Sequence, residues 1–192
     1  MMDKNLDLMK QSEAFLEGHF LLSSGNHSGG YCQCAKLLRF PDKAEAVLST
    51  VAKQIKNLGI TKVCGPAMGG IIVAYELARQ IGVEAIFTER KDDEMQLRRG
   101  FNVGSGDVIM IAEDVVTTGK STMETVKVLR DMGAKVIGVA CIVDRREADC
   151  VLDFPVYSAL KLEIPIYSPE NCPLCAKGLP IEKPGSRKKF GK

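Results

Sequence analysis

Residues 108–121, VIMIAEDVVTTGKS, join an apolar run to two adjacent acids and then to a small, hydroxyl-rich loop. The run from Val108 to Ala112 is typical of a parallel strand that is covered on both faces. Glu113 and Asp114 follow it, and the loop leads into apolar residues at helical spacing. The stretch therefore predicts a buried strand, a tight loop and a helix.

The loop has the composition of a phosphate site, because unpaired N–H groups at a helix start attract anions and Gly119 allows close backbone approach. Gly-Lys-Ser also matches the end of a P-loop, but that motif needs a glycine where this chain has Asp114. Two acids beside a monophosphate loop suit a sugar phosphate, since carboxylates accept hydrogen bonds from ribose hydroxyls. The alternative is a capped turn with solvated acids.

This stretch resembles the phosphoribosyl-diphosphate motif of the type I phosphoribosyltransferases, and features described below resemble their orotate-specific members. The resemblance covers roughly residues 18–165 and implies an α/β fold with a central parallel sheet, flanking helices and a small hood. It implies phosphoribosyl transfer from 5-phospho-α-D-ribose 1-diphosphate (PRPP) to orotate in UMP synthesis, giving orotidine 5′-monophosphate and diphosphate. Mg²⁺ would be bound mainly through the substrate diphosphate. Asp114 would be catalytic, and the implied PRPP-binding residues are Glu113, Asp114, Val115, Val116, Thr117, Thr118, Gly119, Lys120 and Ser121.

Length and composition indicate one globular domain with a small appendage. The 192 residues are 45% hydrophobic and 26% charged, which are ordinary globular values. The net charge of +2 does not indicate a polyanionic partner. No 18-residue apolar run and no signal-peptide core are present, so we expect a cytoplasmic protein with small-molecule substrates and neither nucleic acid nor membrane as partner.

The chain divides into three parts. Residues 1–40 predict a short helix and a β-hairpin that form the hood. Residues 41–168 predict the core: an amphipathic helix over 42–58, then strands alternating with helices, a pattern that places ligands at the carboxyl ends of parallel strands. Residues 169–192 form a Cys- and Pro-containing basic tail.

The sequence GPAMGG, residues 65–70, follows a strand and opens a helix. That context favours a second anion-binding turn, and the resemblance implies a pyrophosphate loop made by Ala67, Met68 and Gly69. Many relatives have a lysine in this loop and this chain has none, so backbone N–H groups would do the binding. A purely structural glycine turn is the alternative.

Residues 91–107, KDDEMQLRRGFNVGSGD, lack an apolar stripe and predict a mobile lid. The resemblance implies a catalytic loop whose cations, Arg90, Lys91, Arg98 and Arg99, stabilise the departing diphosphate. It also implies a homodimer in which each chain lends this loop to its neighbour's site. A solvated charged loop is the alternative.

Asp144, Arg145 and Arg146 end the next apolar strand. Arginine binds carboxylates bidentately, and orotate carries one. The resemblance implies that Arg145 and Thr117 hold orotate while hairpin backbone, including Ser24 and Gly25, contacts the edge of its ring. A surface Asp–Arg pair is the alternative.

Two other functions remain open. A purine phosphoribosyltransferase shares the phosphate motif, although Arg145 speaks against it. A regulator that binds PRPP without catalysis and contacts nucleic acid rests only on the basic tail, whose cations are Lys183, Arg187, Lys188, Lys189 and Lys192.

The seven cysteines are odd in number, and several lie in strand-like segments, so we expect reduced thiols. Cys172-x-x-Cys175 is half of a zinc site, and Cys32-x-Cys34 could supply the rest. We nevertheless expect a metal-free tail. His19 and His27, the only histidines, are expected to be solvated hairpin residues.

Overall fold

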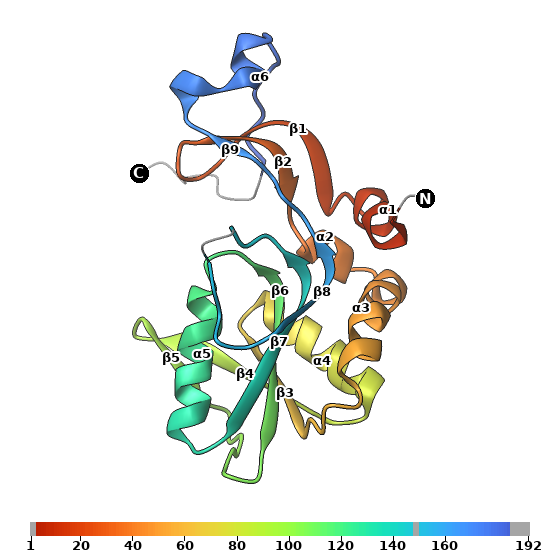
Figure 1. Cartoon of the computed structure of the whole chain (residues 1–192), viewed down its shortest axis with the longest axis vertical. Helices are drawn as coiled ribbons and strands as arrows, with labels where there is room; N and C mark the ends of the chain where they lie inside the picture. The colour runs from red at the N-terminus through yellow and green to blue at the C-terminus, as the bar shows by residue number, and fades with distance from the viewer. Residues whose placement is uncertain (1–2, 148–149, 185–192) are drawn as a thin grey trace.

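The computed structural model describes residues 3–147 and 150–184. Its larger sheet has the strand order β5-β4-β3-β6-β7-β8, and all neighbouring pairs are parallel except β4 with β5 (Figure 1). The α/β prediction with a central parallel sheet is confirmed. The strands are β3 (Lys62–Pro66), β4 (Glu84–Lys91), β5 (Glu94–Leu97), β6 (Val108–Val116), β7 (Lys135–Asp144) and β8 (Val156–Lys161).

Helices cover both faces of this sheet. α3 (Pro41–Ile55) and α4 (Gly69–Ile81) pack on one face, and α5 (Lys120–Asp131) packs on the other (Figure 1). The predicted stripe of α3 is buried, but the helix ends at Ile55, so Leu58 lies beyond it and is 39% exposed. No helix in the described ranges is long and apolar enough to cross a membrane.

The central strand is longer than its sequence pattern predicts. Ile109 to Ala112 are fully buried, as expected for a strand covered on both faces. The strand does not end at the acids, because Val115 and Val116 continue the parallel pairing with Val143 and Asp144 of β7. Glu113 and Asp114 are therefore held within a strand instead of a loop.

A second, smaller sheet has the order β1-β2-β9 and lies beyond the carboxyl ends of the central strands (Figure 1). The short N-terminal helix predicted from the sequence ends at Gln11, and Phe15 and Leu16 belong to β1. The remaining elements are α1 (Lys4–Gln11), β1 (Phe15–Leu21), β2 (His27–Cys32), α2 (Ala35–Leu38), β9 (Ile166–Tyr167), the 3₁₀ helix η1 (Pro169–Asn171) and α6 (Pro173–Ala176).

The segment predicted as an unstructured lid is partly ordered. β4 and β5 form a hairpin through Asp92 and Asp93, which both have positive φ angles as a two-residue hairpin turn requires. Met95 is buried on β5, and Phe101 packs edge-on against Phe87 with ring centroids 5.1 Å apart. Residues 91–107 therefore contain a short strand and packed side chains, and their role as a lid stays a prediction.

The direction of the chain connections locates the ligand site. The connection from β3 through α4 leads to β4 on one side, whereas that from β6 through α5 leads to β7 on the other. The loops that follow β3 and β6 consequently meet at a topological switch point, where open α/β sheets bind their ligands.

Candidate active site

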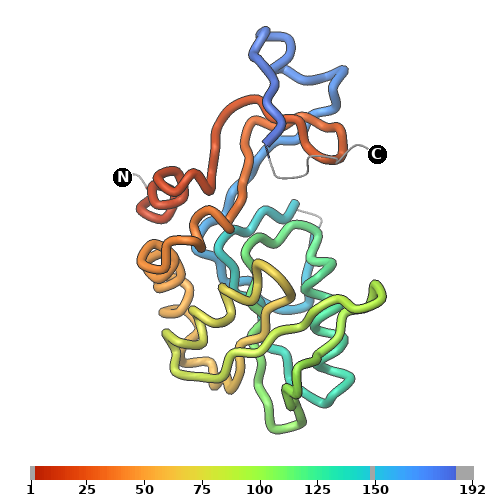
Figure 2. Tube along the Cα trace, turned by 180° about the vertical axis from the view of Figure 1, so that it is seen from behind, coloured from red at the N-terminus to blue at the C-terminus, as the bar shows by residue number. Residues whose placement is uncertain are grey.

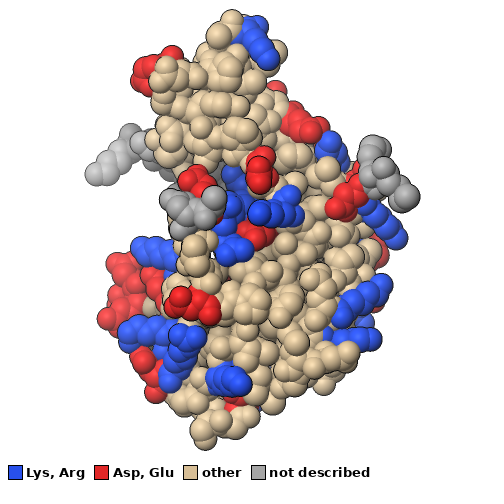
Figure 3. All heavy atoms as spheres, in the orientation of Figure 1, with Lys and Arg blue, Asp and Glu red and all other residues tan. Residues whose placement is uncertain are grey.

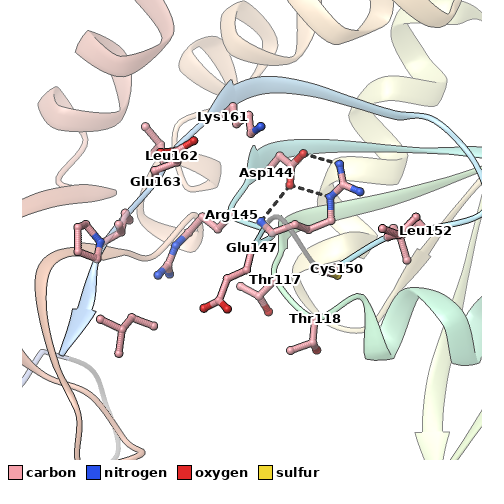
Figure 4. Close-up of a pocket in the computed structure, with 15 residues that line it drawn as sticks. Thr117, Thr118, Asp144, Arg145, Glu147, Cys150, Leu152, Lys161, Leu162 and Glu163 are labelled. Carbon is pink, nitrogen blue, oxygen red and sulfur yellow. Dashed lines mark hydrogen bonds and ion pairs between the residues drawn. The ribbon is translucent and has the colours of Figure 1, made fainter. Parts of the chain in front are cut away.

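A cavity of about 1160 Å³ lies between the two sheets. Figure 3 shows basic side chains gathered in the hollow between the two parts of the molecule, and the basic residues of the cavity lining are Arg145, Arg146 and Lys161. The lining joins the loop after β6 and the end of β7 to residues 161–166, which lead into the smaller sheet (Figure 4). The cavity is therefore walled by both sheets.

The loop after β6 has the geometry expected of a phosphate site. Gly119 has φ = 68°, a left-handed conformation that favours glycine, and α5 starts at the next residue. Thr117, Thr118 and Ser121 surround a small cavity of about 70 Å³ together with Glu113. Free N–H groups at the start of α5 make this cavity suitable for one phosphate group.

The two acids of β6 lie against different helices. Glu113 accepts a hydrogen bond of 3.5 Å from Thr122 Oγ1 in α5, whereas Asp114 lies against Gly69 at the start of α4. Burial, reinforced by the charge of Asp114, raises the pKa of Glu113 to about 8. Burial also raises the pKa of Asp114, although the Val115 N–H donates to its Oδ1 at 2.9 Å. A cation close to this pair would favour the ionised form of both acids.

The valines that follow the acids are partly or fully buried. Val116 is 1% exposed and belongs to the core, and Val115 also packs against apolar neighbours. The Val116 carbonyl accepts a hydrogen bond of 2.8 Å from the Arg145 N–H. Both residues also line the small cavity after β6, so their expected contacts with PRPP stay a prediction.

The glycine turn after β3 is in direct contact with the acids. A Cβ at Gly69 would lie 2.5 Å from the Asp114 carboxylate, and one at Gly65 would lie 2.0 Å from the Gly70 carbonyl oxygen. The peptide bond between Ala67 and Met68 is cis. The Ala67 N–H donates to the Thr88 carbonyl at 2.7 Å, so it is not free to bind diphosphate as expected from the sequence.

Arg145 and Arg146 have different surroundings. Arg146 pairs with Asp144 through Nε and Nη2 at 2.9 and 2.8 Å, whereas Arg145 extends away from Asp144 (Figure 4). The Arg145 Nε atom is buried and has no hydrogen-bond partner among the described residues. The surface-pair alternative therefore applies to Arg146, and Arg145 can bind an anion beside Thr117.

The cations assigned to the lid lie on or beside the β4–β5 hairpin and are mostly paired. Arg90 forms an ion pair with Glu124 of α5, and Arg98 and Arg99 pair with Glu89 at 3.1 and 2.8 Å. Lys91 is exposed and has no ion pair within the described ranges. None of these four residues lines the large cavity of its own chain.

Ser24 and Gly25 lie in the exposed turn between β1 and β2. This turn is closed by the Leu22 N–H, which donates to the Asn26 carbonyl at 2.8 Å. Neither Ser24 nor Gly25 lines the cavity, whose walls on the small-sheet side are Ile164, Pro165 and Ile166. Sequence reasoning missed this last segment because its apolar residues carry no recognisable chemical motif.

The expectation of solvated histidines is wrong. His19 is 4% and His27 8% exposed, and both lie against Cys172 and Cys175 of the tail. All seven cysteines are free thiols. Of the five cations named for the basic tail, only Lys183 lies within the described residues; the other four lie outside them.

Comparison with known proteins gives consistent findings. A sequence model described as the phosphoribosyl transferase domain matches residues 37–174. The orotate phosphoribosyltransferase of Caldanaerobacter subterraneus subsp. tengcongensis is 48% identical over 186 residues, which cover 97% of this chain and 98% of that protein.

Solved structures show the same architecture. The orotate phosphoribosyltransferase from Aeropyrum pernix superposes with a TM-score of 0.71 at 25% identity, covering 82% of this chain and 93% of that one. The adenine phosphoribosyltransferase from Rhodothermus marinus has a TM-score of 0.56 at 20% identity, covering 69% and 86%, and shares the fold alone.

Proposed function

The chain belongs to the phosphoribosyl transferase family, and from this premise we propose that it transfers the phosphoribosyl group of PRPP to orotate. The products are orotidine 5′-monophosphate and diphosphate, as in UMP synthesis. The observation that carries the proposal is Arg145, which lines the cavity next to the phosphate loop and whose buried Nε has no hydrogen-bond partner in the described structure. A carboxylate on the base satisfies such a guanidinium, whereas adenine and guanine carry no anionic group.

The loop after β6 and the strand end hold the sugar phosphate in this proposal. The 5′-phosphate occupies the small cavity at the start of α5, where Thr117, Thr118 and Ser121 supply hydroxyl groups. Glu113 and Asp114 accept hydrogen bonds from the ribose hydroxyls. Orotate lies in the larger cavity, with its carboxylate on Arg145 and Thr117 beside it.

The reaction breaks the bond between the anomeric carbon and the diphosphate oxygen, and a ring nitrogen of orotate forms the new bond as its N–H proton is released to the departing diphosphate or to water. Positive charge builds up on the ribose as the diphosphate leaves, so ionised carboxylates beside the sugar stabilise the transition state more than the ground state. The bond electrons leave with the diphosphate. No covalent enzyme intermediate is required.

The residues present fit a magnesium ion that arrives with the substrate. Glu113 and Asp114 are hard oxygen ligands, but they face different helices and do not form a ready-made chelate. Mg²⁺ commonly combines one or two carboxylates with substrate phosphates and retains several waters. When bound, it would neutralise charge on the departing diphosphate.

We also propose a two-fold dimer in which the β4–β5 hairpin of one chain reaches the site of the other. The hairpin projects from the edge of the large sheet (Figure 2), and Lys91 at its tip lies outside the cavity of its own chain. A reciprocal interface would bring both tips to the neighbouring sites at once. The small sheet then serves as a hood over each cavity.

The test is a panel of orotate, uracil, adenine, guanine and hypoxanthine, each assayed for diphosphate release with PRPP and Mg²⁺. We expect turnover with orotate and little with the other bases. Preference for a purine would establish the purine alternative. PRPP binding by calorimetry without turnover of any base would establish the non-catalytic regulator.

A further inference from the structure

Four side chains that the proposed reaction does not use form a cluster in the small sheet. They are His19 of β1, His27 of β2, and Cys172 and Cys175 on either side of the start of α6. One potential ligand atom from each lies within 4.8 Å of all the others. Three of the four residues are buried, and Cys175 is exposed.

The strand register explains why the two histidines meet. Leu21 of β1 lies opposite His27 of β2, so these two side chains point to the same face of the sheet. His19 is two residues before Leu21, next to a register shift between Glu17 and Phe20, and its ring lies on the same side, with its centroid 4.9 Å from that of His27. The two rings are therefore diagonal neighbours, with His19 Nε2 and His27 Nδ1 3.0 Å apart.

The two thiols of the cluster come from the tail. Cys172 is the N-cap of α6, and Cys175 is in the first turn of this helix. Both sulfur atoms lie close to the histidines of the hairpin. Cys172 Sγ lies 3.5 Å and Cys175 Sγ 3.7 Å from His19 Nε2, and Cys175 Sγ lies 3.3 Å from His27 Nδ1.

Four of the six separations among these ligand atoms are close to the edges of a coordination tetrahedron. With Zn–N bonds of about 2.0 Å and Zn–S bonds of about 2.3 Å, a tetrahedral ion separates two nitrogens by about 3.3 Å and a nitrogen from a sulfur by about 3.5 Å. The observed nitrogen pair at 3.0 Å and nitrogen–sulfur pairs at 3.3 to 3.7 Å fall close to these values. Two thiolates and two imidazoles are also a characteristic ligand set of structural zinc.

The second ring nitrogen of His19 supports the same conclusion. His19 Nδ1 lies 2.9 Å from the Leu179 carbonyl oxygen, which can only accept, so Nδ1 carries the proton. Nε2 then presents its lone pair to the other three ligand atoms. Metal-bound histidines commonly have this arrangement, in which the remote N–H is anchored by a carbonyl or carboxylate.

The small sheet also lacks other sources of stability. Among the described residues of segments 15–33 and 161–184, the only hydrophobic side chains classed as buried are Phe20 and Cys172. The tail is attached to the hairpin mainly by backbone hydrogen bonds at His19 and Leu21 and by the pairing of β9 with β2. Units with so small an apolar core are usually stabilised by disulfides or metals.

We propose that His19, His27, Cys172 and Cys175 bind one structural Zn²⁺ ion that fastens the tail to the β1–β2 hairpin. The ion closes the site with four protein ligands and leaves no position for substrate. Cys32 and Cys34, the partners considered from the sequence, lie 3.8 Å from each other and beside the Asp114 carbonyl instead. The expectation of a metal-free tail considered only these two cysteines as partners and did not include the histidines, which are buried against the tail.

The first test measures zinc in the full chain, expressed with zinc supplied and purified in metal-free buffer with a thiol reductant. We expect about one zinc per chain by mass spectrometry of the metal content. Cys172→Ser/Cys175→Ser should lose it, and the matched double variant Cys32→Ser/Cys34→Ser should retain it. A zinc-free parent, or zinc retained by the Cys172/Cys175 variant, overturns the proposal.

A second test does not depend on variants that could misfold. Replacement of the ion by Co²⁺ in the parent should give the intense visible bands of tetrahedral cobalt and thiolate-to-cobalt charge-transfer absorption. Chelation should abolish both and make residues 166–184 sensitive to limited proteolysis. Absence of the charge-transfer band, or a Cys172–Cys175 disulfide in the reduced, zinc-supplied parent, would refute the site whichever base the enzyme accepts.

Discussion

At the residue scale, two neighbouring arginines have different roles because their surroundings differ. Arg146 is held by Asp144, whereas the Nε of Arg145 is buried beside the cavity without a partner in the described structure. A buried, unsatisfied donor is unfavourable, so a ligand carboxylate gains affinity by pairing with it.

Arg145→Ala should therefore raise the KM for orotate and leave the KM for PRPP nearly unchanged. The lost charged hydrogen bonds correspond to about 1.5 to 3 kcal/mol, or roughly a 10- to 150-fold increase in KM. Steady-state kinetics with each substrate varied in turn measure the difference. The matched variant Arg146→Ala should lower the melting temperature through the unpaired Asp144 and change the KM for orotate much less. Equal weakening of both substrates by Arg145→Ala would show that Arg145 is structural.

The raised pKa of Glu113 makes the stability of the ligand-free protein depend on pH. Its pKa is raised from 4.5 to about 8, chiefly by burial, so between these values the folded protein binds a proton that the unfolded chain has released. Stability from this group is fully present below the unfolded pKa and falls as pH rises toward about 8. In Glu113→Gln the melting temperature of the ligand-free protein should fall less between about pH 5 and about pH 8 than in the parent. An exposed control, Glu17→Gln, should follow the parent, and equal pH slopes in parent and Glu113→Gln would contradict the assignment.

At the element scale, segments with a strong hydrophobic pattern were predictable from the sequence. The end of β6 and the short strand β5 were not. The apolar run before Glu113 and the stripe of α3 predicted a buried strand and a helix because burial follows periodicity. The extension of β6 through Val116 depends on pairing with β7, which sequence spacing does not reveal. β5 was missed because only Met95 in this short strand is apolar and buried.

The junction of β6 with α4 depends on the absence of a side chain at Gly69. In Gly69→Ala the new Cβ would lie 2.5 Å from the Asp114 carboxylate, so that the carboxylate or the turn must shift. A displacement of this order in a catalytic group reduces kcat/KM by about a hundredfold. The control Gly106→Ala places its Cβ where no atom lies within 4 Å and should retain activity within about twofold. Full activity of folded Gly69→Ala would show that the contact can relax without consequence.

At the scale of the whole molecule, the features missed from the sequence join distant parts of the chain. His19 meets Cys172 across 153 positions, and Glu182 bonds to the backbone of β1. No local pattern encodes such contacts, and that is why the histidines were expected to be solvated. The Cys-x-x-Cys pair was the only local signal of the cluster.

The proposed dimer also concerns the whole molecule, and the ion pairs of the β4–β5 hairpin decide which variant tests it best. Arg98 and Arg99 both pair with Glu89, so their replacement would disturb the hairpin itself. Lys91 is exposed and outside such pairs in the described structure, which makes Lys91→Ala the cleaner lid variant. Asp114→Asn is the complementary site variant, and loss of its carboxylate should lower the rate by about a hundredfold or more.

Mixing inactive Lys91→Ala chains with inactive Asp114→Asn chains should restore activity. In an equal, freely exchanging mixture half of the dimers contain one chain of each kind, and each such dimer has one site with an intact Asp114 and an intact Lys91. The expected recovery is therefore roughly a quarter of the parent activity per site. Native mass spectrometry of chains that differ in mass shows whether exchange has occurred, and each variant incubated alone is the control. Exchange without recovery would mean that Lys91 serves the site of its own chain, for which the β4–β5 hairpin would have to fold back toward its own phosphate loop.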